Sequence, residues 1–151
     1  MRTSRKPRAV ILRSNPQLSI LKQNCSDPRM HVALDLLAAC DLKRDVQIEY
    51  LCQALNLSAS RLRHLFHEQL GMSPAQVWKS LRMQEARNLL ISTYKRTKEI
   101  LTDVGLNDAS HFVRDFKDVY GETPSQVRKQ SGLHRKHGPK HDTEHAQRAS
   151  A

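Results

Sequence analysis

One segment of this chain occurs twice: residues 58–79, SASRLRHLFHEQLGMSPAQVWK, recur as residues 108–129, DASHFVRDFKDVYGETPSQVRK. The two copies align without a gap from Phe66 onward. The identical pairs are Phe66 and Phe116, Gly71 and Gly121, Pro74 and Pro124, Gln76 and Gln126, Val77 and Val127, and Lys79 and Lys129. A repeat of this length in a chain of 151 residues indicates one supersecondary unit that is used twice.

Each copy of the repeat is predicted to form a helix, a sharp stop and a second helix. Gly71 can adopt the left-handed backbone that ends a helix. Ser73 can cap the following helix, with Pro74 at its first position. The second copy has the same order, with Gly121, Thr123 and Pro124.

The composition favours a polyanionic partner, because 25 Lys and Arg residues face 15 Asp and Glu residues, for a net charge of +10. The three cysteines, Cys25, Cys40 and Cys52, are irregularly spaced and suit a reducing compartment better than a disulfide framework. No apolar run approaches the roughly 18 residues of a membrane span. We therefore expect a cytoplasmic protein that does not contact a membrane.

The apolar periodicity predicts an all-α fold between two basic ends. Residues 1–24 carry basic residues and two prolines without a sustained period, which is typical of a flexible basic arm, with a short extended piece at 10–12. Residues 132–151 lack an apolar period and are expected to form a disordered basic tail. Helices are predicted over 28–40, 46–55, 58–70, 73–92, 97–104, 108–120 and 124–129.

The helices at 46–55 and 58–70 have the pattern of a helix-turn-helix. Cys52 places a small residue where the two helices would cross, and Asn56 tolerates the positive φ of the turn. The residues expected to hold the second helix inward are Leu57, Leu62, Leu65 and Phe66. Ser60, Arg61, Arg63, His64 and His67 are then left to point outward.

The helix at 73–92 is expected to serve two separate small cores. Val77, Trp78 and Leu81 lie on one side of this helix. The apolar residues near its end, Ala86, Leu89 and Leu90, are rotated away from them. A single apolar stripe would instead indicate one continuous core.

These motifs together resemble the DNA-binding domain of the AraC/XylS family of bacterial transcription regulators. The most specific are Gly-Met-Ser-Pro at 71–74, Leu-Arg at 81–82 with Ala-Arg at 86–87 and Leu-Leu at 89–90, Ser-His-Phe at 110–112, Phe-Lys at 116–117, Gly-Glu-Thr-Pro at 121–124 and Val-Arg at 127–128. The resemblance covers residues 28–130. It implies about seven helices in a domain of residues 25–131, with helix-turn-helix subdomains at 28–72 and 93–131 and a linker helix at 73–92. Both recognition helices would enter the major groove.

The chain departs from the family pattern at two positions in the second subdomain. Leu101 stands where the family usually has Ala, so we expect it to crowd the helix crossing. Leu106 stands where the family usually has Phe or Tyr, and its smaller size would partly compensate. Family members commonly carry a separate effector or dimerisation domain, and we expect this chain to be little more than the DNA-binding domain.

The resemblance also implies which outward residues read DNA bases: Ser60, Arg63, His64, Ala109, Ser110, Val113 and Arg114. Arg63 can bind guanine through two hydrogen bonds. Ala109 and Val113 offer only apolar contact, as to a thymine methyl group. We therefore expect the first unit to supply most of the sequence discrimination and the second unit mainly to add affinity.

Candidate phosphate contacts are the basic residues Arg61, Lys79, Arg82, His111, Lys117 and Lys129. Each could equally be a solvated surface charge. Arg82 or Arg87 could instead bind a carboxylate of the same domain, such as Glu85 or Asp115. His64 and His67 have helical spacing but no accompanying cysteine pair, so we expect no metal site. The tail histidines, His134, His137, His141 and His145, indicate adventitious metal binding at most.

A linker helix of this length is about 28–30 Å long at about 1.5 Å per residue. Successive major-groove segments on one face of B-DNA are roughly 34 Å apart. We therefore predict that one monomer places its two recognition helices in adjacent segments of an asymmetric promoter site, as a sequence-specific transcription regulator. An architectural DNA-binding protein of low specificity is the alternative, and a module that docks on RNA polymerase is a third hypothesis. No catalytic motif is visible, so we expect no enzymatic activity and no cofactor.

Overall fold

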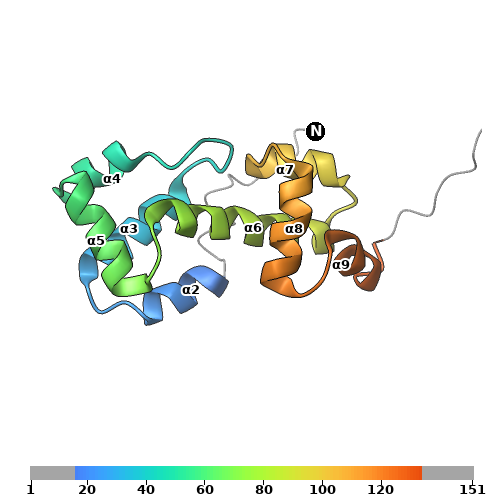
Figure 1. Cartoon of the computed structure of the whole chain (residues 1–151), viewed down its shortest axis with the longest axis horizontal. Coiled ribbons are helices and arrows are strands. Elements are labelled where there is room, and N and C mark those ends of the chain that lie inside the picture. The colour runs from blue at the N-terminus through green and yellow to red at the C-terminus, as the bar shows by residue number, and fades with distance from the viewer. Residues whose placement is uncertain (1–15, 134–151) are drawn as a thin grey trace, which may run out of the picture.

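The computed structural model describes residues 16–133, and this part of the chain contains eight helices and no strand (Figure 1). They are α2 (Pro16–Gln23), α3 (Pro28–Ala39), α4 (Ile48–Leu55), α5 (Ala59–Leu70), α6 (Pro74–Ser92), α7 (Thr97–Val104), α8 (Ala109–Tyr120) and α9 (Pro124–Gln130). The all-α prediction is confirmed. The predictions for residues 1–15 and 134–151 lie outside the described residues.

Local hydrogen bonds explain where these helices begin. The Ser58 hydroxyl accepts a hydrogen bond from the Arg61 backbone N–H, so α5 begins directly after Ser58. Ser73 forms a capping box with Gln76 at the start of α6. The repeat reproduces this capping box with Thr123 and Gln126 at the start of α9.

The predicted turn residues adopt the backbone that their positions require. Asn56, between α4 and α5, has φ 51° and ψ 47°. Gly71 and Gly121 end α5 and α8 with φ values of 65° and 74°. Helix α3 ends one residue earlier than predicted because Cys40 is extended, and α4 begins at Ile48 rather than residue 46.

The first unit comprises α2, α3, α4, α5 and the first half of α6, which share one core. The fully buried side chains of this core include Leu34, Leu37, Leu62, Phe66 and Leu81. Cys52, predicted at the helix crossing, is half-buried against the same core. Helices α3 and α6 thus pack against the inward face of the predicted helix-turn-helix, α4 and α5.

The prediction that residues 1–24 form a flexible arm is wrong for residues 16–23. Pro16–Gln23 form helix α2, whose Leu18 and Leu21 are buried in the first core at 2% and 8% exposure. Lys22 Nζ also lies 2.5 Å from Asp35 Oδ1 on α3. This helix was missed because its eight residues bury only two leucines, too few to reveal a helical period.

The second unit comprises the second half of α6 with α7, α8 and α9. Its buried side chains include Leu90, Ile100, Phe112, Phe116 and Val127. Val77 and Trp78 near the start of α6 belong to the first core, whereas Ala86 and Leu90 belong to the second. The prediction that this helix serves two cores is therefore confirmed.

Leu101 is accommodated as a core residue of the second unit, with 4% exposure. Leu106 packs partly buried against the same core. The turn between α7 and α8 is made by Gly105, whose φ is 72°.

None of the described helices is both long enough and apolar enough to cross a membrane.

Candidate nucleic-acid interface

The two predicted recognition helices, α5 and α8, lie at opposite ends of α6 and run in the same direction in Figure 1. Each follows the first helix of its helix-turn-helix, α4 or α7, after a left-handed turn residue. The N-terminal ends of α5 and α8 therefore lie on the same side of the molecule. This is the arrangement that two helices need to approach one DNA duplex together.

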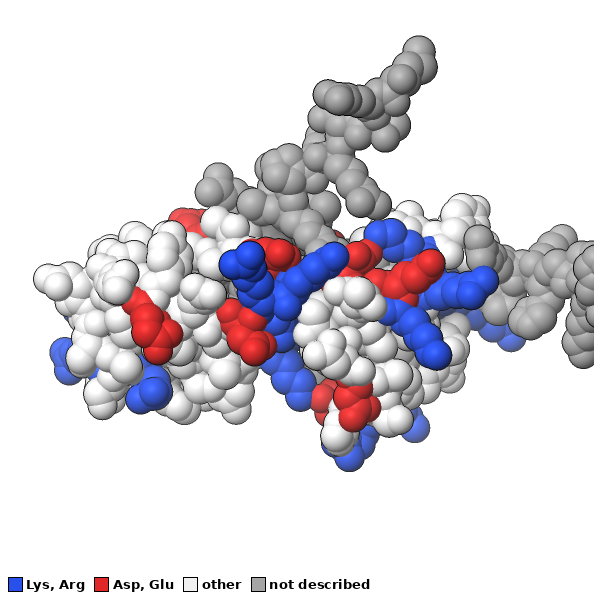
Figure 2. Space-filling view, turned by 90° about the horizontal axis from the view of Figure 1, so that it is seen from above, with Lys and Arg blue, Asp and Glu red and all other residues white. Residues whose placement is uncertain are grey.

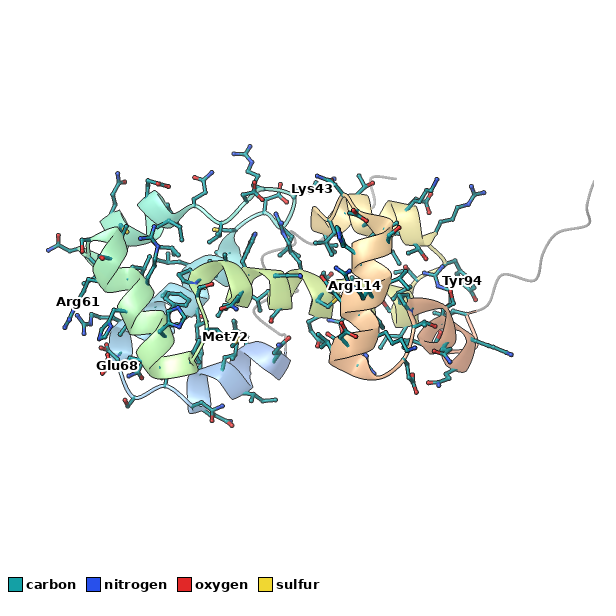
Figure 3. The ribbon with its side chains drawn as sticks, viewed as in Figure 1. Lys43, Arg61, Glu68, Met72, Tyr94 and Arg114 are labelled. Carbon is teal, nitrogen blue, oxygen red and sulfur yellow. The ribbon has the colours of Figure 1, made fainter. Side chains whose placement is uncertain are left out.

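The outward face of α5 carries the predicted reading residues of the first unit. Leu62, Leu65 and Phe66 are buried, as predicted, at 0%, 4% and 0% exposure. The exposed residues of this helix include Ser60, Arg61, Arg63, His64 and His67. Figure 3 shows Arg61 at the outer edge of the first unit, pointing away from the protein. The His64 ring lies 3.9 Å from a Glu68 carboxylate oxygen.

Helix α8 exposes the four predicted reading residues of the second unit, Ala109, Ser110, Val113 and Arg114. Phe112 and Phe116 face inward, with exposures of 2% and 0%. Val113 is an exposed apolar side chain, at 40%. Alanine and valine at this surface leave few hydrogen-bond donors for base edges.

Asp108 caps α8 and neutralises part of its positive N-terminal end. Its carboxylate accepts hydrogen bonds from the backbone N–H groups of Ser110 and His111, both at 2.9 Å. The His111 ring also lies 2.8 Å from Asp108 Oδ2. These contacts, led by the His111 backbone hydrogen bond, lower the pKa of Asp108.

Two further cations, one from each unit, share the carboxylate of Asp115 on α8. Lys79 from α6 forms an ion pair with Asp115. Arg114 Nε lies 3.9 Å from the other oxygen of the same carboxylate. The hydrogen bond from Lys79 lowers the pKa of Asp115 below its ordinary range. The positive charges of Lys79 and Arg114 are therefore partly neutralised by Asp115 within the protein itself.

Arg82 points into the protein, and the prediction that it contacts DNA phosphate is wrong. The residue is only 8% exposed. Its Nε donates a hydrogen bond to the Leu42 carbonyl at 2.8 Å, and Nη2 donates to the Arg44 carbonyl. The guanidinium also lies 3.6 Å from Asp45, a carboxylate of the same domain, as the intra-domain alternative expected, although Asp45 was not one of its two named examples.

The remaining phosphate candidates, Arg61, Lys117 and Lys129, are exposed. Lys79 and His111 are exposed as well, but both lie beside carboxylates. Sequence reasoning missed the loop between α3 and α4, which brings Lys43 and Arg44 to the junction of the two units. Figure 2 shows basic and acidic side chains meeting along this junction. No local pattern marks the loop, because its partners lie far away in the sequence.

A groove of about 560 Å³ runs between the two units, beside the N-terminal half of α8. Its lining combines Lys79, Arg82, His111 and Arg114 with Asp45, Asp108 and Asp115. Both cations and carboxylates therefore line the groove. Within residues 16–133, no group of three or more His, Cys, Asp or Glu side chains is placed to hold a metal ion. The four tail histidines lie outside the described residues.

The arrangement defines a class of protein: an all-helical DNA-binding domain with two helix-turn-helix units on one linker helix. A family model described as "Helix-turn-helix domain" matches residues 51–130. The chain belongs to the AraC/XylS family of transcriptional regulators, as its relatives and solved neighbours agree. The resemblance found in the sequence is confirmed.

Two curated relatives illustrate the match. An HTH-type transcriptional regulator of Haemophilus influenzae is 30% identical over 127 residues, which make up 82% of this chain and 42% of the relative. The arabinose operon regulatory protein of Escherichia coli is 31% identical over 120 residues, 74% of this chain and 41% of the relative. The chain therefore spans less than half the length of these two relatives.

Solved structures match the fold over almost their whole length. An AraC-type regulator from Chromobacterium violaceum has a TM-score of 0.64 at 25% identity, covering 74% of this chain and 96% of that one. A probable AraC family regulator from Rhodopseudomonas palustris also has a TM-score of 0.64, at 26% identity, covering 70% of this chain and 98% of that one. The chain thus contains an AraC-type DNA-binding domain.

Proposed function

We propose that this protein binds an asymmetric promoter site as a monomer, with α5 and α8 in adjacent major-groove segments. The observation that carries this proposal is the placement of two recognition helices, which run in the same general direction, at the two ends of one helix, α6. The 19 residues of α6 extend over about 28 Å, at about 1.5 Å per residue. Adjacent major-groove segments on one face are roughly 34 Å apart, so a modest DNA bend would bring both within reach.

The first unit is proposed to supply most of the sequence discrimination. Arg63 is exposed on α5 and can bind the O6 and N7 atoms of guanine together. Ser60 and His64 would read neighbouring bases from the same face. In the second unit, Arg114 lies beside Asp115, and Ala109 and Val113 lack polar groups. That unit would add affinity with little discrimination.

The proposal is tested first by selecting bound sequences from a random pool of duplex DNA. A regulator of this kind should enrich a bipartite, non-palindromic site and bind it at least about 10³-fold more tightly than unrelated DNA at the same salt concentration. An affinity ratio near one would instead support an architectural protein of low specificity. A palindromic site bound by two copies would contradict the monomeric arrangement.

The second test changes the phase of the two half-sites. Inserting about five base pairs between them rotates one half-site to the opposite face of the duplex. The intact protein should then lose the contribution of one recognition helix in a gel-shift titration. Equal binding to the original and the shifted DNA would show that α5 and α8 do not act together.

A further inference from the structure

The loop of residues 41–47, which joins α3 to α4, contacts the middle of α6. Arg82 donates hydrogen bonds to the carbonyl groups of Leu42 and Arg44. Trp78 Nε1 also donates to the Arg44 carbonyl, at 3.1 Å. The Arg82 guanidinium lies over the Trp78 ring, 5.5 Å from its centroid. A buried guanidinium thus replaces water as the partner of the loop carbonyls.

The same loop also contacts the second unit. Gly105, in the turn between α7 and α8, packs its backbone directly against the loop backbone. A Cβ atom at this position would lie 2.4 Å from the Leu42 carbonyl oxygen and 2.8 Å from Lys43 Cα. Lys43 Nζ also lies 3.9 Å from Asp103 Oδ1 on α7. Figure 3 shows Lys43 at this junction, beside the second unit.

A single helix between the two units would not hold them at a fixed angle. Long helices curve gently, and a small bend in α6 would change both the separation and the rotation of α5 relative to α8. The loop forms a second connection, which runs from the first unit through Gly105 into the second. Two connections together resist bending and twisting that one helix would permit.

We propose that residues 41–45 act as a latch that sets the spacing between DNA half-sites, with Arg82 as its positioning residue. The DNA part of this proposal rests on the proposed function. The buried Arg82 hydrogen bonds and the close Gly105 contact hold the latch closed. The Lys43–Asp103 pair contributes less, because surface ion pairs are weak.

The latch is tested without DNA by ¹⁵N relaxation of the full chain. In the wild-type protein, backbone amides of both units should report the same rotational correlation time. Arg82→Met should give the two units different correlation times while each keeps its folded spectrum. Arg82→Lys, which retains a charged donor, should restore the shared value in part. A folded Arg82→Met protein with one shared correlation time would overturn the proposal.

A matched glycine pair keeps the test decisive if Arg82→Met does not fold. Gly105 and Gly121 both have left-handed backbone, so alanine is strained at either position. Nothing lies within 4 Å of a Cβ atom at Gly121, whereas one at Gly105 would push against the loop. Gly105→Ala should therefore separate the correlation times of the two units, and Gly121→Ala should not. The same result for both glycine variants would contradict the latch.

A binding experiment tests the spacing role. It compares the affinity for the selected site with the affinity for versions whose half-sites are one base pair closer or farther apart. Wild-type protein should lose affinity about tenfold on either version, because the duplex must twist or bend to fit. Gly105→Ala and Arg82→Met should lose less than about threefold, since flexible units adapt to the spacing. Decoupled units that keep the wild-type spacing preference would overturn the spacing role. Decoupling in a protein that recognises no bipartite site would instead contradict the proposed function.

Discussion

The two helix-turn-helix units share a repeated sequence but differ in the charge of their recognition helices. On α5, Arg61 and Arg63 are exposed, and Glu68 near the end of the helix is its one acidic residue. On α8, Arg114 and Lys117 alternate with acidic residues, and Asp108 precedes the helix. The same backbone unit can thus present a basic surface or a mixed one. Position within the repeat therefore predicts which residues face outward but not how strongly they attract DNA.

The units also differ in how their cores are completed. The first unit uses α2 and α3 to cover the back of its helix-turn-helix. The second unit is smaller and relies on aromatic packing, with the Phe112 and Phe116 ring centroids 5.4 Å apart and those of Phe116 and Tyr120 4.6 Å apart. The Arg87 guanidinium lies 5.2 Å from the Tyr120 ring centroid. A repeated motif does not need a repeated core, because different neighbours can bury the same face.

The largest predicted effect compares the equivalent core residues of the two repeats. Phe66 and Phe116 are both completely buried. Phe66→Ala and Phe116→Ala should each lower the free energy of unfolding by about 3–5 kcal/mol, through lost apolar burial and a residual cavity. Urea denaturation measures both values. The control is Val119→Ala, which changes a side chain that is 64% exposed and should have little effect. If Phe116→Ala lowers the free energy of unfolding no more than Val119→Ala does, the second unit has no stabilising core of its own.

A proline in α6 should break the connection between the units. Gln84→Pro should cost about 3 kcal/mol or more in the free energy of unfolding, because proline removes a helix hydrogen bond and clashes with the preceding turn. Gln84→Ala is the control: it removes the hydrogen bonds of Gln84 with Tyr120 and Asn88 but preserves the helix. If both variants are equally stable in urea, a continuous α6 is not required for stability.

The two arginines on the recognition helices test the difference between the units directly. Arg63→Ala should reduce affinity for the selected site by about 1–3 kcal/mol and relax the preference at one base pair. Arg114→Ala should cost less than about 1 kcal/mol, since Asp115 already neutralises part of its charge. Gel-shift titrations at one salt concentration provide both values. If Arg63→Ala weakens binding equally on all DNA sequences, Arg63 contacts a phosphate and does not read a base.

The smallest predicted effect concerns the pH dependence of the second unit. The hydrogen bond from Lys79 lowers the pKa of Asp115 in the folded protein, relative to about 3.9 in the unfolded chain. This contact therefore stabilises the fold above about pH 4 and is lost as the pH falls further. In acid titrations of the unfolding free energy, Asp115→Asn should show a shallower decline than wild type. Asp118→Asn, at an exposed position on the same helix, is the matched control for the removal of one carboxylate.

Helix starts and turns were largely predictable because their causes are local. Ser58 and Ser73 cap helices through backbone N–H groups three residues away. Asn56 adopts its left-handed backbone where the sequence places the turn. Helix α2 was not predictable in the same way, because Leu18 and Leu21 become core residues only when α3 and α6 are present. Its eight residues carry a single charged side chain, that of Lys22.

The sequence by itself determined the repeat, the order of the helices from α3 to α9, and the inward faces of α5 and α8. The helices and their inward faces follow from periodicity and capping within a few neighbouring residues, and the family was indicated by the resemblance of the sequence motifs. Only the tertiary structure decided which cations remain available to DNA. Arg82 binds carbonyl groups 40 and 38 residues away, and Lys79 pairs with a carboxylate on another helix. A charged side chain can turn toward solvent or inward, and its distant partners determine the direction.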